Sequence, residues 1–181
     1  MTIISAYCDG DVVIMGSDSS STDEEHNVHI RRPDCKMWKV DMGNIKMIVG
    51  FAGNFAECQF IKHYFKWPLL YANTTVEKWL VTKVQPHLNE QLAKRFKREL
   101  NWSLLLGINR PARLYTLNEC GDVEYHLSSY ATLGSGSSYA LGALTILEKL
   151  DMTSWEKVEE SIKAAEKFRG DVKGPINILD L

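Results

Sequence analysis

The chain has 181 residues, of which 45 % are hydrophobic, and 21 basic against 23 acidic side chains give it a formal net charge of −2. That balance creates no strong positive field for nucleic acid or for an anionic membrane surface, and no run reaches the roughly 18 to 20 apolar residues that span a bilayer. We therefore expect one globular domain over residues 1–181, with no nucleic acid and no membrane among its partners.

The N-terminus does not read as a secretory signal, because Asp9 and Asp11 interrupt its apolar run before a continuous hydrophobic region forms. The cysteines lie far apart and form no C-x-x-C pair, which favours reduced structural thiols over a zinc or dithiol site: Cys8, Cys35, Cys58 and Cys120. The histidines are equally scattered: His26, His29, His63, His87 and His126. We expect a cytoplasmic protein that uses no metal and no cofactor.

Two β-hairpins are predicted near the N-terminus. The first joins two β-rich runs across Asp9-Gly10, and the second, within "KMWKVDMGNIKMIVGF", turns at Gly43-Asn44. The polar, aperiodic stretch between them, residues 19–34, is expected to be a surface loop. The strands expected here and further along the chain are residues 2–8, 11–16, 103–108, 113–117, 123–127 and 175–181.

Helical periodicity predicts two pairs of helices. In the second predicted helix apolar residues recur at intervals of four, and Pro86 is expected to bend or divide it. Thr153 followed by Glu156 predicts a capping box at the start of the last helix. The expected helices span residues 54–67, 76–100, 137–150 and 154–168. Runs of strands that alternate with pairs of helices indicate an α+β layered domain with antiparallel sheets.

Removal of Met1 would make Thr2 the first residue of the chain. A Thr hydroxyl is a poor nucleophile and needs a base within hydrogen-bond reach; an N-terminal Thr carries one, its own α-amino group, with an unperturbed pKa of about 8. The alternative is that Thr2 is an ordinary first residue of a strand.

Neighbouring features favour the chemical interpretation. The first hairpin brings Asp18 back toward the N-terminus, and Lys36 begins the second hairpin. "VGFAGN" places Gly50 and Gly53 at a strand-to-helix junction, where unpaired backbone N–H groups can face a developing oxyanion. Singly, the acid and the lysine would be solvated surface groups; their joint spacing from Thr2 indicates a catalytic site.

This set resembles the N-terminal-nucleophile hydrolases, specifically the proteasome β subunits and the HslV-type bacterial peptidase. "DVVIMGSDSSST" resembles the strand that carries the family's acid, "CKMWKVD" its lysine strand, and "KMIVGFAGNFAEC" the "GFAGG" corner of HslV-type subunits. "TLGSGSSYALGALTILE" is similar to a segment of proteasome β subunits. The resemblance covers almost the whole chain and implies a four-layer αββα sandwich, two antiparallel sheets with one predicted helix pair on each outer side.

The resemblance also implies a role for each residue of the site. Thr2 would be the nucleophile and its amine the general base, Lys36 would lower the pKa of the Thr2 hydroxyl, and Asp18 would pair with Lys36. Gly53 would donate its N–H to the oxyanion, and Ser135 in "GSGSS" would help to relay the proton.

Two features of the resemblance leave alternatives open. In "EKFRGDVKGP" the family's late aspartate matches Arg169 or Asp171, and Asp171 is favoured because a carboxylate can orient Ser135 and the amine. The segment between Asp18 and Lys36 is two residues longer than the family pattern and puts Pro33-Asp34-Cys35 at the substrate-pocket wall. The residues implied to line that pocket are Ser21, Trp38, Phe51 and Phe55. The three aromatic residues would favour apolar substrate side chains there, and the alternative is that they belong to the core.

Three functions follow as alternatives: a threonine peptidase, a non-catalytic ring subunit, and an amidase acting on a small molecule. The chain lacks the long C-terminal portion expected of such amidases, which favours a ring subunit. The resemblance implies a homo-oligomeric ring that encloses the Thr2 sites and acts on peptides or unfolded proteins, with an ATP-dependent unfoldase ring as an open partner. A retained Met1 would block the amine and leave an inactive subunit.

Overall fold

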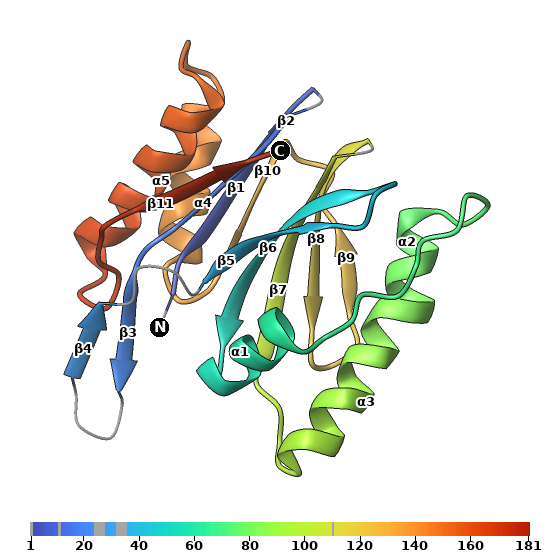
Figure 1. The fold of residues 1–181 in the computed structure, drawn as a ribbon. Coiled ribbons are helices and arrows are strands. Elements are labelled where there is room, and N and C mark those ends of the chain that lie inside the picture. The colour runs from blue at the N-terminus through green and yellow to red at the C-terminus, as the bar shows by residue number, and fades with distance from the viewer. Residues whose placement is uncertain (1, 11, 24–27, 32–35, 110) are drawn as a thin grey trace.

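Two antiparallel sheets lie face to face between two layers of helices (Figure 1), which confirms the predicted α+β sandwich with αββα layering. The computed structural model describes residues 2–10, 12–23, 28–31, 36–109 and 111–181. Within these residues no helix combines the length and the apolar character needed to cross a bilayer.

The first sheet is built from both ends of the chain. Its strand order is β10-β1-β2-β11, so the N-terminal hairpin lies in the middle and the strands of the C-terminal half flank it (Figure 1). The predicted hairpin across Asp9-Gly10 is confirmed, with Ile4 opposite Ser17. The strands are β1 (Ile4–Asp9), β2 (Val12–Ser17), β10 (Tyr130–Leu133) and β11 (Asn177–Asp180).

The second sheet is a meander in which each strand pairs with the next one in sequence, in the order β5-β6-β7-β8-β9. It contains the predicted second hairpin, with Gly43 at a φ of 80° in its turn. The strands are β5 (Met37–Asp41), β6 (Lys46–Gly53), β7 (Trp102–Asn109), β8 (Ala112–Asn118) and β9 (Val123–Tyr125).

The helices cover the outer faces of the sheets as predicted. One layer contains α1 (Phe55–His63), α2 (Val76–Trp79), η1 (Leu80–Val84) and α3 (Gln85–Phe96), and the other contains α4 (Ser137–Leu147) and α5 (Ser154–Phe168) (Figure 1). The capping box of α5 is confirmed. Glu156 N–H donates to Thr153 Oγ1 at 3.2 Å, and Thr153 N–H donates to Glu156 Oε2 at 2.8 Å.

Near Pro86 the predicted helix 76–100 changes from an α-helix to a π-helix and back, and the chain stays helical as far as Phe96. Immediately before Pro86 the chain makes a π-helical turn, in which the Gln85 N–H donates to the Leu80 carbonyl five residues back. Because Pro86 has no N–H to donate, the wider turn carries the helix past it without a break. The helix ends at Phe96, earlier than predicted, because Lys97 takes a left-handed conformation with φ 48° and ψ 34°.

Alternation along the strands sends apolar side chains into three separate cores between the four layers. One core lies under α1–α3, one between the sheets, and one under α4 and α5. Representative buried members are Trp79, Leu88 and Trp102 in the first, Ile4, Met15 and Leu105 in the second, and Leu144, Val158 and Ile162 in the third.

The prediction of a loop over residues 19–34 is wrong in part. β3 (Ser20–Asp23) and β4 (Val28–Arg31) pair as a two-stranded antiparallel ribbon. Its sequence is polar and has no hydrophobic period, so the pattern that predicts a strand is missing here. The Pro33-Asp34-Cys35 segment lies outside the described residues.

Candidate active site

Thr2 stands at the head of β1 and is 9 % exposed. The loop before α4 closes over its backbone, since the Gly136 N–H donates to the Thr2 carbonyl at 3.3 Å. Gly134 takes a φ of 98°, and a Cβ at that position would lie 2.3 Å from the Thr2 carbonyl oxygen. Only glycine meets both conditions, so the "GSGSS" segment docks on Thr2 by direct backbone contact.

A buried ion pair flanks Thr2 on the β2 side. Asp18 Oδ1 accepts the Ile3 N–H at 2.9 Å and Lys36 Nζ at 2.6 Å, while Oδ2 accepts the Ser20 N–H at 3.1 Å and lies 2.6 Å from Ser20 Oγ. The side chains of Asp18 and Lys36 are 0 % and 9 % exposed. The carboxylate thus holds the lysine beside the residue that follows Thr2, as the predicted pairing requires.

A second hydrogen-bond chain reaches the backbone of Thr2 from the C-terminal end. The Thr2 N–H donates to Ser135 Oγ at 3.3 Å, and Ser135 Oγ lies 3.1 Å from Asp171 Oδ2. Arg169 grips the same carboxylate, with Nε 2.8 Å from Oδ1 and Nη2 2.9 Å from Oδ2. Burial of Asp171 opposes its ionisation, but hydrogen bonds from Arg169, its own backbone and Ser135, with the Arg169 charge, lower the pKa of Asp171 below its usual value.

The loop that leads into β7 holds the strand-to-helix junction at Gly53 in place. Gly53 has a φ of 130°, and a Cβ there would lie 2.2 Å from the Asn101 carbonyl oxygen. That oxygen accepts the Asn54 N–H at 2.8 Å. The fully buried Glu57 accepts the Asn101 N–H at 3.0 Å and lies 2.8 Å from Arg98 Nη2. An acid in the first turn of α1 therefore fixes the loop against which the corner is built.

A cavity of about 300 Å³ opens beside Thr2. It brings Gly53 from β6 and Ser135 from the loop before α4 together with Thr2, and its other lining is mostly small or polar. The lining residues are Thr2, Ala52, Gly53, Asn101, Ser103, Leu133, Gly134 and Ser135. Asn101 and Ser103 were not predicted, because the start of a β-strand carries no motif that marks a cavity.

Of the residues predicted to line a substrate pocket, Trp38, Phe51 and Phe55 are not among the described residues that line this cavity. Phe51 is 3 % exposed in the core beneath α1–α3, and the half-buried Trp38 packs against the same core. Phe55 is the partly buried first residue of α1. The backbone of Ser21 pairs with Ile30 in the β3–β4 ribbon, and its side chain lies outside the described part of the structure.

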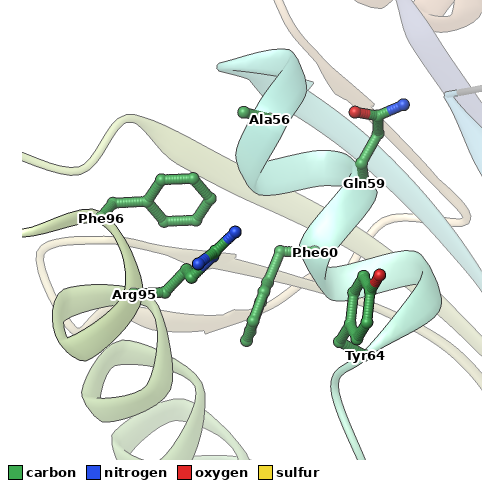
Figure 2. A pocket seen from close by; sticks show the side chains of 6 residues that line it. All are labelled: Ala56, Gln59, Phe60, Tyr64, Arg95 and Phe96. Carbon is green, nitrogen blue, oxygen red and sulfur yellow. The ribbon is translucent and has the colours of Figure 1, made fainter.

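A second cavity, of about 530 Å³, lies in the outer helical layer away from Thr2. Figure 2 shows Phe60 of α1, Tyr64 just after the end of α1, and Arg95 and Phe96 at the end of α3 around this cavity. Ala56 and Gln59 complete the lining. Among the residues that the structure describes, none of those predicted for the site lines this cavity.

Among the described residues no three or more His, Cys, Asp or Glu side chains gather where they could hold a metal ion. The titratable groups near Thr2 instead form the two ion pairs already described, Asp18 with Lys36 and Asp171 with Arg169. The groups around Thr2 can hold its backbone nitrogen and carbonyl in place, and the polar side chains among them can exchange protons next to that nitrogen.

Known proteins resemble this chain in sequence and in fold. A family model described as proteasome subunit matches residues 2–173. The curated ATP-dependent protease subunit HslV of Campylobacter concisus is 28 % identical over 166 residues, which cover 91 % of this chain and 88 % of that protein.

Solved structures show the same fold. HslV from Trypanosoma brucei has a TM-score of 0.73 at 18 % identity and is covered over 99 % of both chains. Thiobacillus denitrificans BPH in complex with epoxomicin has a TM-score of 0.71 at 16 % identity, over 99 % of this chain and 98 % of that one. Anbu from Yersinia bercovieri has a TM-score of 0.78 at 16 % identity, over 99 % of this chain and 81 % of its own.

Proposed function

The chain belongs to the proteasome subunit family, and on that basis we propose that it is a threonine peptidase whose nucleophile is Thr2 after removal of Met1. The observation that carries the proposal is the convergence of two polar networks on this residue. The Asp18–Lys36 pair binds the Ile3 N–H on one side, and Ser135 with Asp171 contacts the Thr2 nitrogen on the other.

The proposed reaction uses the freed α-amine of Thr2 as general base. The amine takes the proton from Thr2 Oγ while the oxygen attacks the peptide carbonyl, and the Gly53 N–H and the Lys36 charge stabilise the negative charge that develops. The amine then gives its proton to the leaving amine, which leaves an ester on Thr2. Water, deprotonated by the same amine, hydrolyses the ester and restores the free hydroxyl.

The proposed substrates are peptides or unfolded proteins. Because several of the residues that line the cavity beside Thr2 are polar, it suits polar side chains next to the bond that is cut. The name of the Campylobacter concisus relative describes an ATP-dependent protease subunit, and by analogy we propose a cytoplasmic homo-oligomeric ring with an ATP-driven unfoldase as its partner.

The proposed ring predicts the oligomeric state of the purified chain. A peptidase site on a free subunit would be open to every protein in the cytoplasm, so the purified chain should sediment and scatter light as a closed oligomer at micromolar concentration. Mass photometry and light scattering with size exclusion measure this directly. A monomer would refute the ring and shift weight to an amidase acting on a small molecule.

The peptidase proposal is tested by the mass of the intact protein before and after exposure to epoxomicin. We expect the untreated mass to lack Met1, and the treated mass to rise by one inhibitor per subunit at Thr2. A processed, assembled protein that takes up no epoxomicin and cleaves no peptide would contradict the proposal and leave a non-catalytic ring subunit. Retention of Met1 would have the same consequence, because the base would then be an amide nitrogen.

A further inference from the structure

The ion pair of Arg169 with Asp171 stands directly behind the Thr2 nitrogen. The guanidinium contacts both carboxylate oxygens, at 2.8 Å and 2.9 Å. From Asp171 Oδ2 a hydrogen bond of 3.1 Å leads to Ser135 Oγ, and from there a contact of 3.3 Å leads to Thr2 N. Two hydrogen-bond lengths therefore separate a carboxylate from the nitrogen that is the base in the proposed reaction.

A carboxylate in this position creates an electrostatic problem for that reaction. Its negative charge stabilises the protonated amine and raises the amine pKa, whereas a general base must be unprotonated. The side chain of Asp171 is only 9 % exposed, so water screens the charge weakly. Without a compensating positive charge, Asp171 would still orient Ser135, but it would keep the Thr2 α-amine protonated.

The surrounding charges show how the problem is offset. On the β2 side Asp18 and Lys36 form a buried ion pair with no net charge, so this pair does not cancel the charge of Asp171. They connect to Asp171 through Ser20 Oγ, which lies 2.6 Å from Asp18 Oδ2 and 2.5 Å from the Asp171 carbonyl oxygen. On the other side Arg169 supplies the positive charge at the carboxylate itself; the hydrogen bond and charge of Asp171, and to a smaller extent the electrostatic influence of Tyr139, raise the pKa of Arg169.

We propose that Arg169 is a charge-compensating positioning residue: by neutralising Asp171 it lets that carboxylate orient Ser135 and Thr2 without raising the proton affinity of the Thr2 amine. Arginine suits this task because its guanidinium stays charged at every relevant pH and binds a carboxylate through two parallel contacts. The inference rests on the proposed function for the identity of the base.

The test measures the pKa of the Thr2 α-amine itself in the processed protein. The rate at which acetic anhydride modifies the N-terminus is followed by mass spectrometry as a function of pH, which needs no turnover. Arg169→Gln should raise the amine pKa by about one unit, because an unpaired carboxylate remains two hydrogen bonds away. The acid limb of kcat/KM on a fluorogenic peptide should move by the same amount, and activity should recover at alkaline pH.

Three further variants make the result specific. Arg169→Lys keeps the charge and should leave the amine pKa within about 0.3 units of the unmodified protein. The double variant Arg169→Gln/Asp171→Asn removes both charges and should return the amine pKa toward that of the unmodified protein. Asp171→Asn alone removes the negative charge and keeps that of Arg169, so it should lower the amine pKa, which keeps the proposal testable if Arg169→Gln fails to fold.

An amine pKa that stays constant across these variants in folded protein would overturn the inference, even if activity fell. Activity lost equally at every pH, with the amine pKa unchanged, would mean that Arg169 is structural only. The two proposals fail in different ways: a protein without peptidase activity whose amine pKa still follows the charge at residue 169 would refute the peptidase and support the compensating role.

Discussion

Thr2→Ala should abolish peptide hydrolysis and epoxomicin labelling while leaving the assembled fold intact. Without the hydroxyl no acyl-enzyme ester can form, and the loss of a nucleophile that acts together with its base typically lowers kcat by about 10⁴-fold or more. The side chain removed is small and lies at the edge of a cavity that stays lined by Gly53, Ser135 and their neighbours. Hydrolysis of a fluorogenic peptide amide and the mass of the intact protein measure the two effects.

Thr2→Ser is the matched control, because it keeps both the hydroxyl and the α-amine. It should retain measurable turnover and one inhibitor per subunit. Light scattering on both variants separates chemistry from assembly. Peptide hydrolysis by a correctly processed Thr2→Ala ring, at a rate near that of the unmodified protein, would place the nucleophile elsewhere.

Lys36→Met should reduce the rate by several orders of magnitude and also weaken the fold. The rate falls because the positive charge that favours the unprotonated amine and the developing oxyanion is lost. The fold weakens because the Asp18 carboxylate, with its side chain 0 % exposed, loses a charged partner; breaking such a buried pair from one side costs about 3–5 kcal/mol. Peptide turnover and thermal denaturation report the two losses separately.

The double variant Asp18→Asn/Lys36→Met distinguishes catalysis from stability. It replaces the buried pair by neutral groups, so the melting temperature should recover toward that of the unmodified protein, while turnover should stay low. Asp18→Asn alone should cost less activity than Lys36→Met if the carboxylate only holds the lysine. Recovery of turnover together with stability in the double variant would show that the lysine charge has no part in the reaction.

Local signals predicted the elements whose formation depends on neighbouring residues. Asp9-Gly10 marked the first hairpin, and the Thr153–Glu156 capping box marked the start of α5, because turns and caps are decided within a few residues. The end of the helix at Phe96 was missed, since the left-handed turn at Lys97 has no glycine to announce it. The strand β10 was missed as well, because it is short and its pairing partner, β1, lies at the other end of the chain.

Local signals likewise predicted one part of the candidate site and not the other. The spacing of Thr2, Asp18 and Lys36 along two hairpins predicts that these residues lie close together. The 2.6 Å contact between Asp18 and Lys36 agrees with this prediction for the acid and the lysine. The chemistry of a carboxylate favoured Asp171 over Arg169 as the late acid, and Asp171 is the residue that lies 3.1 Å from Ser135 Oγ. The sequence did not predict that Arg169 pairs with the Asp171 carboxylate, because this contact depends on the turn after α5 and on no spacing rule.

The sheet that joins both ends of the chain has a consequence for how the protein is made. Residues 37–125 carry the whole meander and can pair their strands in order as they leave the ribosome. The sheet that carries Thr2 cannot form in that order: β1 and β2 are synthesised first, but β10 and β11 at their edges, and Asp171, are synthesised only after the meander is complete. A nascent chain therefore holds no complete Thr2 site until residues well beyond the meander have been made.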